Sequence, residues 1–205
     1  SEMCIRDRNN IPLLVVDDIR AVLGRVSAAI YGNPSYDVPV IGITGTSGKT
    51  TTSYLIESAF RTAGHSVGMI GTTGSRINGV RVPSSLTTPE APDLQRLFAT
   101  MRDDGVHRIV MEVSSHSLLL GRVGGTRFRI GAFLNLSQDH LDFHHTMEEY
   151  FQAKARLFTK DSGTCCDRAV ICIDDSWGLR MRDIAEASGC TPVSYTHLTL
   201  PTNRE

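Results

Sequence analysis

The sequence has few cysteines, little excess charge and no long apolar run. Its five cysteines are an odd number, two are adjacent, and none has metal-ligand spacing, which argues against a disulfide framework and for a reducing cytoplasm. The net charge is −1 and no basic patch stands out, so nothing indicates nucleic-acid binding. No run approaches the ~18–20 apolar residues that span a bilayer, and the first residues lack a signal-peptide hydrophobic segment. We therefore expect a cytoplasmic protein, taken to be a monomer, that binds neither nucleic acid nor membrane.

The chain has 205 residues, of which 40% are hydrophobic, and this suffices for one compact α/β domain with a real core. Short apolar runs alternate with helical patterns from Val38 onward. We expect strands at 40–43, 67–70, 109–113, 130–136 and 169–173, a hairpin within 74–82, and helices at 49–63, 93–102, 146–158 and 176–187. Such alternation favours a mostly parallel sheet with helices on both faces.

The chain divides into four parts. Residues 1–8 and 194–205 show no clear periodicity and are set aside as disordered or non-native tails. Residues 38–193 are interpreted as an incomplete central domain. Residues 9–37 are interpreted as the remnant of a preceding domain and a linker at 32–35. They contain a short strand pattern at 13–16 and a helix with apolar positions at Ile19, Val22, Leu23, Val26 and Ile30.

The most informative stretch is a phosphate-loop pattern, in which a buried strand turns through two glycines into a helix: Thr44-Gly45-Thr46-Ser47-Gly48-Lys49-Thr50-Thr51. Glycines let backbone N–H groups approach phosphate oxygens, and the helix N-terminus adds free N–H groups and its positive dipole end. Lys49 supplies a charge for the outer phosphates, and the Thr50 hydroxyl can bind Mg²⁺. We therefore expect a phosphate site here. The alternative is a tight strand-to-helix turn that happens to hold a lysine.

Glu112 interrupts an apolar strand, where a charge is costly unless it is paired or binds metal. At the carboxyl end of a parallel strand it would face the crevice where ligands bind, and Mg²⁺ takes carboxylates there together with phosphate oxygens. The alternative is an edge strand or a salt bridge. His140, in the loop 137–142, would lie at the same edge and could bind a second cation or position water. A solvated loop histidine is the alternative for that residue.

Lys154 lies on the apolar stripe of the helix expected at 146–158, with Met147, Tyr150, Phe151 and Phe158. Lysine is rarely fully buried. The common outcome is a stem packed on apolar surface with its ammonium in water. The functional alternative is a lysine aimed into the phosphate site, modified so that it is no longer a cation.

Three further polar clusters are ordinary loops individually and candidate contacts for an anionic substrate together: Thr87-Thr88, Ser114-Ser115-His116 and Arg122. With them, four motifs resemble the Mur ligases in order and spacing: Thr44–Thr52, Glu112-Val113-Ser114-Ser115-His116, Asn135-Leu136-Ser137-Gln138-Asp139-His140-Leu141-Asp142 and Ala153-Lys154. The resemblance covers about residues 13–193. It is closest to the branch that adds the third residue to UDP-N-acetylmuramoyl-L-alanyl-D-glutamate.

The resemblance implies a P-loop-type central domain of an ATP-dependent amide ligase of peptidoglycan and cell wall biosynthesis. In such enzymes the γ-phosphate of ATP passes to a substrate carboxylate, and the amine of an incoming diamino acid then displaces phosphate from the acyl phosphate. By position, it implies that ATP is held by Gly45, Thr46, Ser47, Gly48, Lys49, Thr50 and Thr51. It implies one Mg²⁺ on Thr50 and Glu112, a second on His140, and a carbamylated Lys154 beside them. Contacts to the UDP-linked muramoyl dipeptide are implied for Thr87, Thr88, Ser114 and Arg122.

The sequence departs from this family at Leu86, Leu120 and Cys172, where Asn, Gln and Asn are frequent. The resembled family has three domains, and we expect this chain to hold only the tail of the first and most of the central one, without the domain that binds the incoming amino acid. The choice between meso-diaminopimelate and lysine therefore stays open. One alternative is a nucleotide-binding fragment without turnover. Another is a folylpolyglutamate-synthase-like ligase, which shares the loop and the modified lysine; the Thr87-Thr88 loop and residues 112–116 favour the muramoyl branch.

Overall fold

The computed structural model describes residues 15–82 and 86–197. One eight-stranded sheet has the order β4-β3-β2-β5-β1-β6-β7-β8. Its strands are β1 Val40–Thr44, β2 Val67–Ile70, β3 Ser75–Ile77, β4 Val80–Val82, β5 Arg108–Glu112, β6 Phe128–Phe133, β7 Arg168–Cys172 and β8 Thr191–Tyr195. Every pairing is parallel except those of the hairpin β3–β4. The expected α/β class and mostly parallel sheet are confirmed.

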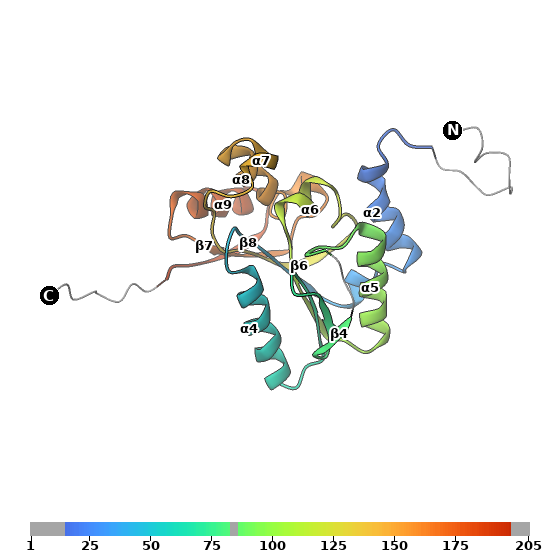
Figure 1. Ribbon diagram of the computed structural model, residues 1–205. Coiled ribbons are helices and arrows are strands. Elements are labelled where there is room, and N and C mark those ends of the chain that lie inside the picture. Colours follow the sequence, from blue (N-terminus) through green and yellow to red (C-terminus); the bar gives the residue numbers. More distant parts are fainter. Residues whose placement is uncertain (1–14, 83–85, 198–205) are drawn as a thin grey trace.

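Helices cover both faces of this sheet (Figure 1). They are α2 Ile19–Ile30, α3 Pro34–Asp37, α4 Lys49–Thr62, α5 Ala91–Asp103, α6 Ser115–Leu119, α7 Leu141–His144, α8 Met147–Ala155 and α9 Ser176–Ala187, with a short 3₁₀ helix η1 at Lys160–Ser162. Successive residues of β1 serve opposite faces. Val40 packs into the large core under α5, α6, α8 and α9, whereas Ile41 packs into a smaller core with Ile56 and Phe60 of α4.

The register of three central strands brings the predicted motifs to one edge. Ile43 of β1 is aligned with Glu112 of β5, and Thr44 with Phe133 of β6. The loop that follows β1, the carboxylate that ends β5 and the segment that follows β6 therefore meet at the carboxyl edge. This is the edge where open parallel sheets bind ligands.

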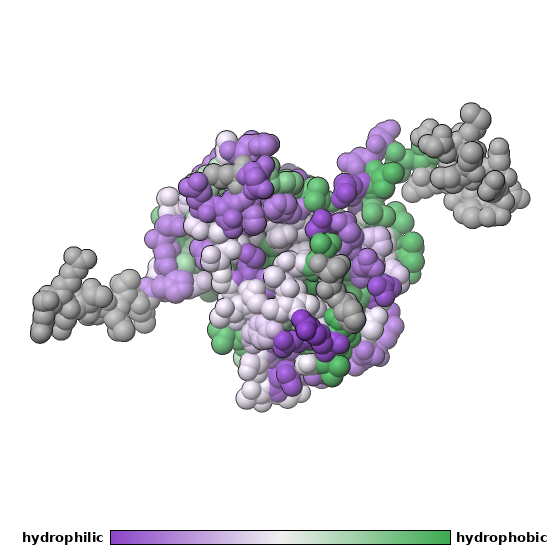
Figure 2. All heavy atoms as spheres, viewed as in Figure 1, coloured by the Kyte–Doolittle hydropathy of each residue, from purple (hydrophilic) through white to green (hydrophobic). Residues whose placement is uncertain are grey.

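The helix α2 buries a different side from the one that its apolar pattern predicts. Gly24, Ser27 and Ala28 are buried, whereas Ile19 is 67% and Ile30 75% exposed. The cause is close packing, because a Cβ on Gly24 would lie 2.4 Å from the carbonyl oxygen of Gly124. Figure 2 shows the resulting hydrophobic surface over α2. On α4, likewise, Leu55 is 66% exposed although the spacing places it on the apolar side.

Several element boundaries differ from the sequence expectations. Val15 and Val16 are not in a strand, and residues 13–14 lie outside the described ranges. Residues 34–37 form α3, which begins inside the expected linker and extends past it, and α5 begins at Ala91 rather than at the expected residue 93. The sequence pattern missed β8, in which Ser194 and Tyr195 pair with Ile171 and Cys172. Residues 194–205, which the sequence analysis set aside as a tail, therefore begin within β8. The hairpin at 74–82 is confirmed, with positive φ at Asn78 and Gly79 as its turn requires.

Candidate active site

The phosphate loop lies between β1 and α4 and is held in shape by Asn135, in the segment that follows β6. Gly48, at φ 84°, precedes the first residue of α4 in the left-handed region that favours glycine. The Asn135 side-chain oxygen accepts from the backbone N–H groups of Thr46 at 3.1 Å and Ser47 at 3.0 Å, while its amide donates to the Ser47 carbonyl at 3.1 Å. Two of the loop amides are thus engaged by Asn135. The amides at the start of α4 are the ones that a helix leaves without intrahelical partners.

Two lysines converge on the carbonyl oxygen of Gly45. Lys49 Nζ donates to it at 2.9 Å and to the Thr46 carbonyl at 2.8 Å, while Lys154 Nζ, from α8, donates to it at 2.9 Å. Burial lowers the pKa of Lys49, although Glu112 and Asp139 oppose that shift. A loop lysine and a helix lysine 105 positions later in the chain thus place their side-chain nitrogens against the same carbonyl oxygen of the loop.

Lys154 is buried, with 1% of its surface exposed. The alternative in which its ammonium reaches water is therefore wrong. Its Nζ lies 4.3 Å from the centroid of the Tyr150 ring. Burial lowers the pKa of Lys154 to about 7, and the positive charge of Lys49 adds to the effect. A substantial fraction of this side chain is consequently a neutral amine near pH 7.

Glu112 lies inside the sheet, in β5 between β2 and β1, and it is 1% exposed. Both of its carboxylate oxygens lie 3.0 Å from the Thr50 hydroxyl. Thr72 adds its backbone N–H at 3.0 Å and its hydroxyl at 3.1 Å. Within the described ranges Glu112 forms no ion pair, so the alternatives of an edge strand and a salt bridge are wrong.

The surroundings of Glu112 fit a divalent cation. A buried carboxylate without a cationic partner is costly. Here both carboxylate oxygens lie close to the Thr50 hydroxyl oxygen, so the two side chains can bind one ion together. Hydroxyl and carboxylate oxygens are hard ligands of the kind that Mg²⁺ takes beside phosphates. Thr50 and Glu112 would hold such an ion next to the start of α4.

His140 lies in the loop before α7, with 48% of its side chain exposed and Nε2 3.5 Å from Asp139. Its ring centroid is 5.0 Å from that of His116 and 6.0 Å from that of Tyr150, the ring that Lys154 also contacts. Burial lowers the pKa of His144 to about 4 and also lowers the pKa of His116. Both shifts favour the neutral imidazole, the form in which a ring nitrogen can bind a cation.

The four candidate substrate contacts differ in accessibility. Thr87 is half-buried, and its hydroxyl lies 3.2 Å from that of Thr72. Thr88 is 1% exposed and its hydroxyl donates to the Glu112 carbonyl at 2.9 Å, which favours a structural role. Ser114 caps α6 by accepting from the Ser117 N–H. Arg122 Nε lies 2.7 Å from Glu90, so its charge is already compensated within the protein.

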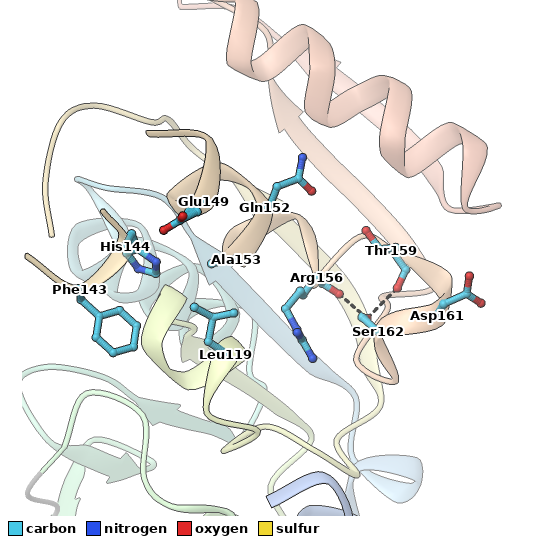
Figure 3. A pocket seen from close by; sticks show the side chains of 10 residues that line it. All are labelled: Leu119, Phe143, His144, Glu149, Gln152, Ala153, Arg156, Thr159, Asp161 and Ser162. Carbon is cyan, nitrogen blue, oxygen red and sulfur yellow. Dashed lines mark hydrogen bonds between the residues drawn. The ribbon is translucent and has the colours of Figure 1, made fainter. Parts of the chain in front are cut away.

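A separate cavity of about 640 Å³ lies beside α6, α7, α8 and η1 (Figure 3). Its lining includes none of the predicted site residues; it consists of Leu119, Phe143, His144, Glu149, Gln152, Ala153, Arg156, Thr159, Asp161 and Ser162. Elsewhere, Cys172, Asp174 and His197 have ligand atoms within 4.8 Å of one another, a cluster that residue spacing did not predict. His197 belongs to the range set aside as non-native or disordered, so we assign this cluster no role.

Sequence reasoning missed two residues that organise the site, Thr72 and Asn135. Asn135 stands inside one of the family motifs, which was its only signal, and Thr72 follows β2 without any signal of its own. In the part of the chain that the structure describes, no helix combines the length and apolar character that crossing a membrane would require.

Comparison with known proteins identifies the family of this chain. The family described as Mur ligase middle domain matches residues 43–200. The UDP-N-acetylmuramoyl-L-alanyl-D-glutamate–2,6-diaminopimelate ligase of Corynebacterium glutamicum is 64% identical over 174 residues, 85% of this chain and 34% of that protein. The Streptomyces avermitilis ligase of the same name is 51% identical over 186 residues, 91% of this chain and 35% of that protein. The chain thus spans about a third of the length of these relatives.

Solved structures show the same arrangement. A structure of UDP-N-acetylmuramoyl-L-alanyl-D-glutamate–2,6-diaminopimelate ligase superposes with a TM-score of 0.75 at 32% identity, covering 92% of this chain and 38% of that one. Escherichia coli FolC in complex with DHPP and ADP superposes with a TM-score of 0.66 over 94% of this chain and 51% of that one. Its 18% identity indicates a shared fold alone. The family match, the two close relatives and the ligase structure together show that this chain belongs to the Mur ligase family, of which it carries the middle domain.

Proposed function

We propose that this chain is the nucleotide-binding part of an ATP-dependent amide ligase that adds the third peptide residue to UDP-N-acetylmuramoyl-L-alanyl-D-glutamate. The observation that carries the proposal is the convergence of Lys49, Lys154, Thr50 and Glu112 on the loop after β1. The names of the relatives support 2,6-diaminopimelate as the residue added.

In this proposal the loop at residues 45–51 binds the triphosphate of ATP. Lys49 would exchange its two carbonyl partners, Gly45 and Thr46, for oxygens of the outer phosphates. Thr50 and Glu112 would hold Mg²⁺, and the bound ion would neutralise charge on the phosphates. An oxygen of the substrate carboxylate attacks the γ-phosphorus and ADP leaves. The diamino acid amine then attacks the acyl carbon of the acyl phosphate, and inorganic phosphate leaves.

Lys154 is proposed to act as a carbamate. Its neutral amine, favoured by burial and by Lys49, would attack CO₂, and loss of one proton from nitrogen leaves an anionic carbamate. Carbamylation thus places an anion beside the Lys49 ammonium, where an unmodified Lys154 would be neutral or positively charged. An anion here could support a second Mg²⁺ together with His140, since both residues contact the Tyr150 ring.

We propose residues 38–193 as the central domain and residues 9–37 as the remnant of a preceding domain with its linker. The incoming amine would be held by parts of the protein outside this chain. Alignment of reactants supplies much of the rate of such two-substrate reactions. The 205-residue chain is therefore expected to bind nucleotide and to form no tripeptide product.

Calorimetry of Mg-ATP binding tests this proposal on the chain and its Lys49→Ala variant. Loss of a hydrogen-bonded charge should cost ~1.5–3 kcal/mol, about a 10- to 150-fold weaker affinity. Lys160→Ala, which removes an exposed lysine of η1, is the matched control and should bind normally. Equal affinities of wild type and Lys49→Ala would remove Lys49 from the site. Phosphate release measured with and without the muramoyl dipeptide, and separately with a folate substrate, distinguishes the muramoyl ligase from a folylpolyglutamate-synthase-like one.

A further inference from the structure

Thr72, the second residue after β2, lies against the carboxylate of Glu112. Its backbone N–H reaches Oε1 at 3.0 Å and its hydroxyl reaches Oε2 at 3.1 Å. The approach is tight, because a Cβ on the preceding Gly71 would lie 2.2 Å from Oε1. The backbone at residues 71–72 therefore closes one side of the carboxylate, while Thr50 faces it from α4.

The hydrogen count at Thr72 sets the direction of a short chain of hydroxyls. A threonine hydroxyl has one hydrogen, and a carboxylate can only accept. Since the Thr72 hydroxyl donates to Glu112, the 3.2 Å contact between Thr72 and Thr87 requires Thr87 to be the donor. Thr87 thus donates to Thr72, and Thr72 donates to Glu112.

The neighbouring residue of the same loop contacts Glu112 by a second route. The buried hydroxyl of Thr88 donates to the main-chain carbonyl of Glu112 at 2.9 Å. The loop at residues 87–88 therefore contacts Glu112 at its main chain directly, and at its carboxylate through Thr72.

We propose that Thr72 is a positioning residue that orients the Glu112 carboxylate for a divalent cation and ties it to the loop carrying Thr87 and Thr88. The inference rests on the proposed function, because it assumes that Glu112 binds the cation of Mg-ATP. Thr72 contacts the carboxylate through its backbone N–H and its hydroxyl. A substitution removes only the hydroxyl, so the experiment tests the contribution of the hydroxyl. Groups that orient metal-binding carboxylates typically change metal affinity by about 10- to 100-fold when they are removed.

The test is Mn²⁺ binding to the 205-residue chain, followed by electron paramagnetic resonance with a non-hydrolysable ATP analogue present. Thr72→Val removes the hydroxyl and keeps the side-chain shape, and it should weaken Mn²⁺ binding by about 10-fold or more. Thr72→Ser restores a hydroxyl and should return the affinity to near the wild-type value. Thr73→Val is the matched control, because the Thr73 hydroxyl contacts Tyr54 rather than Glu112.

Thermal unfolding followed by circular dichroism separates positioning from stability. The inference requires Thr72→Val to lose Mn²⁺ affinity while it stays folded at the assay temperature, and Thr73→Val to bind as wild type. Wild-type affinity in Thr72→Val, or an equal loss in Thr73→Val, would overturn the inference and leave the proposed function standing. Failure of the wild-type chain to bind Mn²⁺ with the analogue would overturn the proposed function and the inference with it.

Discussion

The phosphate loop and the carboxylate cluster are adjacent in space but are built in opposite ways. The loop is one continuous stretch, residues 44–51, in which Lys49 donates to carbonyls three and four residues earlier. The cluster is assembled from Thr50, Thr72, Thr88 and Glu112, whose hydrogen bonds span 24 to 62 positions of the chain. The loop can therefore be recognised from local chemistry, whereas the cluster exists only once β2, β5 and β1 are aligned.

The largest expected effect concerns the loop and its contact with Lys154, whose Nζ donates to the Gly45 carbonyl. In the full-length ligase, Lys154→Ala should abolish amide formation, because the proposed carbamate cannot form. Formate or acetate should restore part of the activity if the missing feature is an anion. Steady-state assays with thermal unfolding as a folding control measure both. Full activity of Lys154→Ala would refute the functional role, and inactivity of a folded variant without rescue would argue against the carbamate.

The next largest effect concerns the cluster alone. Glu112→Gln keeps the shape but removes the charge, and it should weaken Mn²⁺ and Mg-ATP binding by about 1.5–3 kcal/mol. Glu186→Gln, an exposed position on α9, is the control for loss of one negative charge. If Glu112→Gln lowers metal affinity more than it lowers affinity for ATP without metal, the carboxylate cluster binds the cation and the loop binds the phosphates. Unchanged metal binding would place the cation elsewhere.

A third effect is a pH dependence of stability that originates at Lys154. Its pKa falls from the ordinary lysine value of 10.5 to about 7 on folding, so between these values the unfolded chain binds more protons than the folded one. The free energy of unfolding contributed by Lys154 should therefore rise with pH across this window, by at most about 1.4 kcal/mol per pH unit.

Denaturant unfolding of wild type and Lys154→Met, in buffer free of CO₂ and metal, measures this contribution. The difference between the two proteins should change in favour of wild type as pH rises from 7 to about 10. Parallel pH profiles of the two proteins would show that the ammonium is solvated or that its charge is compensated in both states.

The smallest effect concerns the side-chain hydrogen bonds of Asn135 to Thr46 and Ser47 in the loop. Asn135→Ala removes one donor and one acceptor from the loop, and half-exposed partners can turn to water, so we expect a loss of about 1–2 kcal/mol in unfolding free energy. Asn135→Asp retains the acceptor for Thr46 and Ser47 and should keep most of the stability, while its charge weakens ATP binding. Normal ATP affinity in Asn135→Ala would show that the loop holds its shape without these hydrogen bonds.

Much of this fold follows from local pattern. The expected strands at 67–70 and the helix at 176–187 coincide with β2 and α9, because apolar runs bounded by turn residues have few other solutions. The buried faces of α2 and α4 could not be predicted from apolar periodicity. On α2, Gly24 and its small neighbours allow a close approach to Gly124, and a pattern of apolar residues does not reveal such a contact. The strand β8 was missed because its residues are mostly exposed and lack the alternation of a buried strand.

The sequence by itself determined the strand, turn and helix around Lys49, since glycines, a lysine and hydroxyl residues at fixed spacing dictate a local geometry. It also marked Glu112 and Lys154 as charges in apolar surroundings, without saying how each is accommodated. The tertiary structure decided that Lys154 is buried rather than solvated, that Thr88 turns inward, and that Thr72 and Asn135 hold the site together. The reason is that these contacts depend on strand register and helix packing, which set distances between residues that have no local relation in the chain.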